Sequence, residues 1–210
     1  MAQPNGQSAR GAQRVPSNDS VLESDEMRLV WLDMEMTGLE PEICQPIEIA
    51  TLVTNGELEI LAEGPNIVIH QPDEVLAAMD AWNTEHHGLS GLTDAVRASR
   101  VTCAEAEAAT VAFLMQWLPP KMSPLCGNTV AQDRRFMRRY MPNLDAYFHY
   151  RHVDISTIKE LVRRWYGLTP PPKQTNHRAL DDIKESVEEL RWYRQVVFRD
   201  VALVAHTDTP

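Results

Sequence analysis

The chain has 210 residues, 43% of them hydrophobic, which suffices for one core of ordinary size and excludes a chain that is disordered throughout. Its formal net charge of −10 excludes tight, nonspecific binding of long nucleic acid, because such binding requires many Lys and Arg contacts to phosphates. A short phosphate substrate held through metal ions stays compatible with this charge, since the cations supply local positive charge.

The chain also lacks the features of secreted and membrane proteins. Cys44, Cys103 and Cys126 are odd in number, widely spaced and form no C-x-x-C pair, which indicates a reducing cytoplasm rather than a disulfide frame or a zinc site. No apolar stretch is long enough to span a bilayer, and no signal-peptide core follows the N-terminus. We therefore expect a cytoplasmic protein with no membrane partner.

Composition divides the chain into a tail, one domain and a short end. Residues 1–26 are rich in Gln, Asn, Ser, Gly and Ala, with few large apolar side chains, and are expected to form a disordered tail. Residues 27–199 are expected to form the single domain, and residues 200–210 a short C-terminal tail.

The first part of the domain is rich in predicted strands. Residues 28–34, 46–54 and 58–69 have the composition of strands, and Asn55-Gly56 is expected to form the hairpin turn between the second and third. Short strands are also expected at 124–128 and 151–155.

Helices are predicted around and between these later strands. Thr102-x-x-Glu105 and Thr157-x-x-Glu160 are capping boxes that are expected to begin helices. The predicted helical segments are 72–88, 102–118, 130–140, 157–166 and 178–198. Three strands followed by alternating helices and strands indicate an α/β fold, with a mixed β-sheet flanked by α-helices.

Two carboxylates follow the first predicted strand. Side chains at i and i+2 of a strand point the same way, so Asp33 and Glu35 face one side and repel each other unless a proton or cation lies between them. Oxygen ligands of this kind suit Mg²⁺. The apolar run 29–32 before them and the turn signal Thr37-Gly38 after them favour a metal site over a chance D-x-E on a loop.

Asp133 is a third candidate metal ligand. It falls within the apolar stripe of its predicted helix, three residues after Val130, and aspartate is seldom buried unless it is paired or coordinated. An ion-paired aspartate in the first turn, beside Arg134 and Arg135, is the alternative. Thr129, just before this helix, can offer a hydroxyl to a phosphate.

The last group of candidate site residues consists of His177 and one of two aspartates, Asp181 or Asp182. His177 is expected in the loop before the final helix, where a histidine alone is most often a surface residue; near metal-binding carboxylates it suits proton transfer from water. Asp181 shares a helix face with Glu185 and Glu188, so Asp182 is the preferred inward ligand.

Together these residues resemble the DEDDh 3′→5′ exonucleases, and longer strings resemble the oligoribonuclease family over residues 28–198. The strings are WLDMEMTGL at 31–39, EHHG at 85–88, GNTVAQDRRF at 127–136, DISTIKEL at 154–161 and HRALDD at 177–182. Thr129 stands where the family usually has Ser, which keeps the hydroxyl, and the loop 167–176 is shorter than in some relatives.

The resemblance implies a ribonuclease H-like fold and a site with two Mg²⁺ or Mn²⁺ ions. Asp33, Glu35, Asp133 and Asp182 would hold the metal, and His177 would deprotonate the attacking water. The implied substrates are RNA oligonucleotides of a few residues, above all dinucleotides, cut to 5′-mononucleotides.

The resemblance also implies an obligate homodimer, in which Tyr150 enters the site of the partner subunit. Ordinary packing of the aromatic cluster 147–150 is the alternative for that residue. The implied substrate-binding residues are Leu39 and Trp82 against the bases, Thr129, Ser156 and the partner's Arg151 at the 5′ phosphate, and His87 in the pocket.

Two alternative functions are compatible with the same residues. A proofreading or tRNA-trimming exonuclease of the same superfamily would act on longer strands. A noncatalytic nucleic-acid-binding module would have kept the fold and lost the chemistry, although all five catalytic positions hold competent residue types.

Overall fold

A computed structural model describes residues 25–172 and 178–198 of the chain. Residues 1–24 of the expected N-terminal tail, the expected tail at 200–210 and His177 lie outside the described residues. Within the described part, residues 25–27 form a short 3-10 helix, η1 (Asp25–Met27), directly before the first strand.

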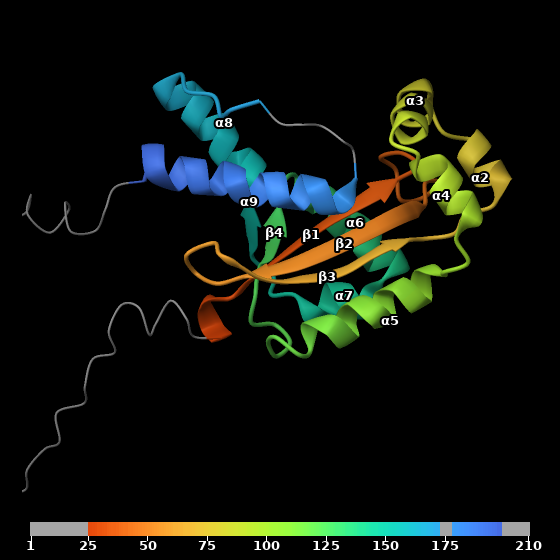
Figure 1. Cartoon of the computed structure of the whole chain (residues 1–210), viewed down its shortest axis with the longest axis horizontal. Coiled ribbons are helices and arrows are strands. Elements are labelled where there is room, and N and C mark those ends of the chain that lie inside the picture. Colours follow the sequence, from red (N-terminus) through yellow and green to blue (C-terminus); the bar gives the residue numbers. More distant parts are fainter. Residues whose placement is uncertain (1–24, 173–177, 199–210) are drawn as a thin grey trace, which may run out of the picture.

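A five-stranded mixed sheet forms the centre of the domain, in the order β3-β2-β1-β4-β5 (Figure 1). The three long strands are antiparallel, whereas β1, β4 and β5 are parallel neighbours. The strands are β1 (Leu29–Met36), β2 (Pro46–Thr54), β3 (Ile60–Val68), β4 (Leu125–Gly127) and β5 (His152–Asp154). This arrangement confirms the mixed sheet expected from the order of the predicted elements.

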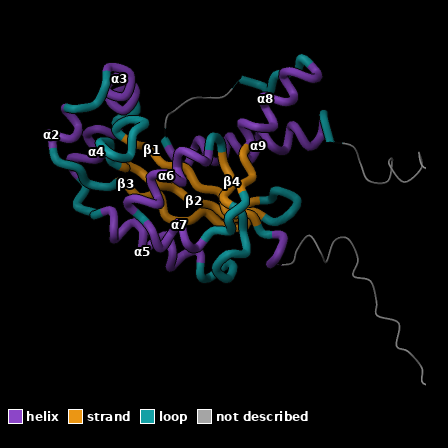
Figure 2. Tube along the Cα trace, turned by 180° about the vertical axis from the view of Figure 1, so that it is seen from behind, coloured by secondary structure: helices purple, strands orange, loops and turns teal. Residues whose placement is uncertain are grey.

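Helices cover both faces of this sheet (Figures 1 and 2). Helices α8 and α9 lie on one face, α5, α6 and α7 lie on the other, and α2, α3 and α4 gather beyond one end of the long strands. The helices are α2 (Asp73–Ala77), α3 (Ala81–Leu89), α4 (Leu92–Ala98), α5 (Cys103–Leu114), α6 (Val130–Tyr140), α7 (Pro142–Tyr147), α8 (Ile155–Tyr166) and α9 (Ala179–Val196).

The alternation of side chains along β1 places its residues in two of the three hydrophobic clusters of the described core. Leu32 and Met34 pack in a cluster with Phe136 of α6 and other residues of that face, whereas Trp31 packs in a second cluster with Ile183 of α9. Asp33 and Glu35 share the parity of Trp31, so they point toward the face that α9 covers. The strand pattern thereby delivers the two carboxylates to the start of the final helix.

Several local expectations differ from the structure. The helical segments predicted near 72–88 are α2 and α3, but α4 and α7 were not predicted. The predicted cap of α8 at Thr157 is wrong: the helix begins at Ile155, because the Asp154 side chain accepts a hydrogen bond from the Ser156 N–H. The capping box at Thr102 is confirmed, but α5 ends at Leu114 and not at Leu118.

The predicted Asn55-Gly56 hairpin is a longer turn. The Asn55 side chain accepts hydrogen bonds from the N–H groups of Glu57 and Glu59, and Leu58 takes a left-handed φ of 69°. The asparagine therefore folds the turn through its side chain, which is the mechanism of an Asx turn rather than of a two-residue hairpin.

Gly127 ends β4 beside the Leu32 carbonyl of β1. A Cβ at this position would lie 2.9 Å from the carbonyl oxygen of Leu32 and 3.1 Å from a methyl carbon of Val130. Only glycine fits without movement of the backbone. This close approach sets α6, which begins at Val130, directly beside the carboxylate-bearing end of β1.

Candidate functional site

Three carboxylates from β1 and α9 converge at one point. One oxygen each of Asp33, Glu35 and Asp182 lie within 4.8 Å of one another. Asp33 and Glu35 come from the same face of β1, and Asp182 comes from the first turn of α9. An oxygen-only donor set of this size fits a hard divalent cation such as Mg²⁺ or Mn²⁺.

Asp133 joins this group from α6. Its Oδ1 accepts a hydrogen bond of 3.1 Å from the N–H of Met34, the residue between Asp33 and Glu35. Its side chain is 5% exposed, and its charge is the largest electrostatic influence on Asp33 after burial itself. The structure therefore brings together all four carboxylates that were predicted as metal ligands.

Burial and mutual repulsion disfavour ionisation of these carboxylates. Burial raises the pKa of Glu35 to about 8, and repulsion from Asp182 adds to the effect. Burial also raises the pKa of Asp133 to about 7, and burial with repulsion from Asp133 raises the pKa of Asp33 well above its ordinary value. A divalent cation would reverse this balance by stabilising the charged forms.

An ion pair between a buried glutamate and a partly exposed arginine lies beside the cluster and was not predicted from the sequence. Glu48 on β2 lies opposite Glu35 on β1, is fully buried, and its Oε1 is 2.6 Å from Nη2 of Arg178. Glu48 Oε2 also accepts a hydrogen bond from the N–H of Ala179, the first residue of α9. The signal that could have found it is a glutamate between Ile47 and Ile49 in an apolar strand.

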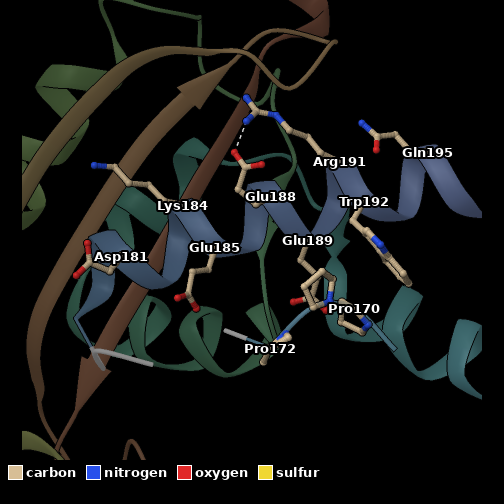
Figure 3. Close-up of a pocket in the computed structure, with 11 residues that line it drawn as sticks. Pro170, Pro172, Asp181, Lys184, Glu185, Glu188, Glu189, Arg191, Trp192 and Gln195 are labelled. Atoms are coloured by element: carbon tan, nitrogen blue, oxygen red, sulfur yellow. Dashed lines mark hydrogen bonds and ion pairs between the residues drawn. The ribbon is translucent and has the colours of Figure 1, made fainter. Parts of the chain in front are cut away.

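Asp181 and Asp182 lie on different sides of α9. Asp181 lines a cavity of about 620 Å³ between this helix and the proline segment 170–172, together with Glu185 and Glu188 (Figure 3). Asp33, Glu35 and Asp182 are not among the residues that line it. The cavity is therefore separate from the carboxylate cluster, and Asp182 is the aspartate that faces β1.

The predicted phosphate-binding residues meet at the start of α6 and α8. Asp154 Oδ1 accepts hydrogen bonds from the Thr129 N–H at 3.0 Å, the Ser156 N–H at 3.0 Å and the Ser156 hydroxyl at 2.6 Å. Thr129 is exposed, has a left-handed φ of 55°, and makes no side-chain capping bond to α6. Asp154 thus holds Thr129 and Ser156 next to each other.

The predicted base-contacting residues differ in exposure. Leu39 is 70% exposed, and Trp82 on α3 is 54% exposed and stacks on His86 with 3.9 Å between ring centroids. His87 is 1% exposed, and its Nε2 donates to the carbonyl oxygen of Met36 at the end of β1. His87 therefore anchors α3 to the end of β1, and its buried ring does not offer an exposed surface to a base.

Tyr150 and Arg151 lie at the other end of the sheet. His152 is level with Val30 through the parallel pairings of β4, and Asp33 is three residues further along β1, about 10 Å at the rise of a strand. β5 is also two strands from β1, about another 10 Å across the sheet. Tyr150 lies two residues before His152 and is 74% exposed, so its ring cannot reach the Asp33 cluster of the same chain.

Comparison with known families places the chain among exonucleases. The family described as "Exonuclease" (RNase_T) matches residues 30–190. A protein of Shewanella oneidensis named "Oligoribonuclease" is 58% identical over 180 residues, which cover 85% of this chain and 99% of the relative. A protein of the same name from Shewanella baltica shows the same identity and the same coverage.

Solved structures support the fold independently. E. coli exonuclease I in a metal-free complex with single-stranded DNA aligns with a TM-score of 0.62 at 14% identity, over 81% of this chain and 40% of that chain. Exonuclease I of Methylocaldum szegediense aligns with a TM-score of 0.61 at 18% identity, over 81% and 41%. This chain thus spans about two fifths of those larger proteins. Among the described residues, no helix combines the length and the apolar character of a membrane span.

Proposed function

The chain belongs to the oligoribonuclease family of exonucleases, and on that premise we propose how its residues hydrolyse short RNA. The protein is a metal-dependent 3′→5′ exoribonuclease that acts on short RNA, and we assign dinucleotides as its characteristic substrates and 5′-mononucleotides as its products. The observation that carries this proposal is the convergence of Asp33, Glu35 and Asp182 beside Asp133.

We propose Mg²⁺ or Mn²⁺ as the metal, with two ions in each site. Asp33, Glu35 and Asp182 would hold one ion, and Asp33 would also ligate the second, with Asp133 assisting through water. When bound, such ions lower the pKa of a water ligand and stabilise negative charge on the phosphodiester. His177, outside the described residues, is our candidate for the base that takes the proton from the attacking water.

The rest of the site is proposed to select a short substrate. Thr129 and Ser156 would bind the 5′ phosphate, because Asp154 holds them together and leaves the Thr129 hydroxyl outside the helix cap. Leu39 and Trp82 would pack against the bases, since both are exposed and an aromatic face stacks on any base. His87 would support these contacts indirectly, because its hydrogen bond to Met36 joins α3, which carries Trp82, to the end of β1.

We further propose that the enzyme is a homodimer with shared sites. Tyr150 cannot reach its own carboxylate cluster, so both Tyr150 and Arg151 would act on the substrate of the partner subunit. The exposed apolar side chains Leu161, Trp165 and Tyr166 on α8 would be covered in such a dimer. We place the enzyme in the cytoplasm, where Cys44, Cys103 and Cys126 stay as the free thiols that the structure contains.

The direct test is hydrolysis of a two-nucleotide RNA and of a long single strand by the purified protein. We expect the dinucleotide to be turned over faster, activity to be lost when the metal is chelated, and a mass twice the 23.8 kDa of one chain. Preference for the long strand would favour the proofreading or trimming alternative. Unchanged activity in Asp33→Ala would show that the assigned chemistry is wrong.

A further inference from the structure

The loop 148–151 presents Tyr150 without holding its side chain directly. The Tyr150 ring is exposed and touches only its chain neighbours among the interactions described, with the ring of His149 at 4.3 Å and the guanidinium of Arg151 at 5.6 Å. The backbone around it is fixed: the His149 N–H donates to the Ser123 carbonyl at 2.9 Å, and the Arg151 N–H donates to His149 Nδ1 at 3.1 Å. The orientation of Tyr150 is therefore set through its neighbours.

Arg134 of α6 is the side chain that ties this loop to the domain. Its Nη1 donates to the His149 carbonyl at 2.8 Å and lies 3.2 Å from Nε2 of His152 on β5. Its Nε donates to Asp145 Oδ1 at 2.7 Å, and its Nη2 donates to the Asp145 carbonyl at 3.3 Å. One planar guanidinium thus joins α7, the loop and β5, which a point charge such as Lys could not do.

The burial of this network indicates that its geometry is fixed. Arg134 is 7% exposed, and Asp145 is largely covered. His152 is itself exposed, but partial desolvation, with repulsion from Arg134, lowers the pKa of its ring and favours the neutral form that can accept a hydrogen bond from the guanidinium. A buried arginine that is itself held by two hydrogen bonds to Asp145 gives the His149 carbonyl a donor at a fixed position, which restricts the conformation of the loop.

Two neighbouring residues of α6, Asp133 and Arg134, therefore make contacts at opposite ends of the sheet. Asp133 turns to Met34 beside the carboxylates of its own subunit, and Arg134 turns to the loop that bears Tyr150. We propose that Arg134, with Asp145, is a positioning residue that orients Tyr150 for the site of the partner subunit. This inference rests on the proposed sharing of sites in a homodimer.

Mixed dimers test this proposal, because they separate the two ends of α6. One chain carries Asp33→Asn and keeps its Tyr150; the other carries Tyr150→Ala and keeps its carboxylates. The two chains bear different affinity tags, and only doubly tagged dimers are assayed on a dinucleotide. The single complete site in such a dimer uses the carboxylates of the second chain and the Tyr150 of the first.

Arg134→Gln is then added to either chain in turn. In the Asp33→Asn chain it should lower kcat on the order of tenfold or more, because the only functional Tyr150 loses its orientation. In the Tyr150→Ala chain it should leave activity within about twofold, because that loop has no role in the complete site. Arg138→Gln, which removes an exposed arginine 3.6 Å from the same Asp145, should have little effect in either chain.

Each outcome of this experiment decides between the proposals. Equal effects of Arg134→Gln in the two chains, or no effect in either, would overturn the positioning role. Absence of activity in the starting mixed dimer would overturn the sharing of sites and this inference with it. If Arg134→Gln fails to fold because Asp145 loses its nearer partner and keeps only Arg138 at 3.6 Å, Arg134→Gln/Asp145→Asn removes both charges and should show the same dependence on the chain that carries it.

Discussion

Arg178 and Glu48 join the start of α9 to the middle of the sheet across 130 residues of sequence. Arg178 Nε lies 3.0 Å from Oε1 and 3.1 Å from Oε2 of Glu48, and Nη2 lies 2.6 Å from Oε1. The pairing with Glu48 raises the pKa of Arg178, which therefore stays charged. The ion pair holds the helix that delivers Asp182 against the strand that delivers Asp33 and Glu35.

We expect Arg178→Met to destabilise the protein strongly. The Glu48 carboxylate would stay buried with no cation beside it, which typically costs about 3–5 kcal/mol of unfolding free energy. Urea unfolding of the metal-free protein measures this. The control is Arg194→Met, whose partner Glu57 is partly exposed, and its cost should stay below about 1 kcal/mol. Equal losses in the two variants would show that the buried pair contributes no more than a surface pair.

Asp182→Asn and Asp181→Asn should behave differently although the residues are neighbours. At a saturating concentration of Mg²⁺, about 100 times Kd, we expect the Tm of the wild type to rise by roughly 5–10 °C. Asp182→Asn should lose most of this rise together with activity, because one oxygen ligand is neutralised. Asp181→Asn should keep both, because Asp181 faces the outer cavity. The two variants are compared by their Tm with and without Mg²⁺ and by their rate of dinucleotide hydrolysis. Equal losses in Asp181→Asn and Asp182→Asn would contradict the assignment of Asp182 as the metal ligand.

The stability of the metal-free protein should fall as pH rises from about 4.5 to 8. The folded pKa of Glu35, about 8, lies above its ordinary value of 4.5, so the native state keeps a proton that the unfolded state releases between these values. Stability therefore decreases with pH through this window, and Glu35→Gln should remove part of the decrease. The measurement is the unfolding free energy with chelator at pH 6 and pH 8.5. If Glu35→Gln raises the unfolding free energy no more at pH 8.5 than at pH 6, relative to the wild type, the raised pKa of Glu35 would be contradicted.

Gly127→Ala should destabilise the domain by about 1–3 kcal/mol, because the new Cβ would meet the Leu32 carbonyl at 2.9 Å. The matched control is Gly88→Ala on α3, where a Cβ meets no atom within 4 Å. That substitution should be neutral or stabilise by up to about 1 kcal/mol, since alanine favours the helix. Denaturant unfolding of both variants distinguishes a packing effect from a general intolerance of side chains at glycine positions.

Asp154→Ala should weaken discrimination for the 5′ phosphate. It removes the acceptor that holds Thr129 and Ser156 together, and it also removes the cap of α8, which costs about 1 kcal/mol. We expect the ratio of kcat/KM for a 5′-phosphorylated dinucleotide over its unphosphorylated form to fall. Thr102→Ala removes a comparable cap from α5, far from these residues in sequence, and should leave the ratio unchanged. An unchanged ratio in Asp154→Ala as well would remove Thr129 and Ser156 from the phosphate site.

Local patterns in the sequence were enough to predict much of the fold and the faces on which the carboxylates lie. The bounds of β2 and α6 were predicted to the residue, and the period of two along β1 put Asp33 and Glu35 on one face. The helical period of α9 predicted that Asp182 points toward the sheet and that Asp181 lies on the outer face with Glu185 and Glu188. These predictions succeed because backbone geometry fixes which residues of one element share a face.

Local patterns also misled where two of them competed. Thr157-x-x-Glu160 has the form of a capping box, yet Asp154 caps α8 three residues earlier, because β5 ends there and brings its carboxylate to the Ser156 N–H. The choice between the two starts depends on where the preceding strand stops, which a window of four residues does not contain.

The sequence by itself was enough to predict the chemistry of this protein, from four acidic residues and a histidine in an order that permits metal-dependent hydrolysis. Only the tertiary structure decided which groups support them, since Glu48 meets Arg178, and Arg134 meets His149, through contacts between separate elements. Strand register decided that Tyr150 lies at the far end of the sheet from its own carboxylates. The physical reason is that one-dimensional periodicity sets the direction of a side chain within its element, whereas pairing of strands and packing of helices set the distance between elements.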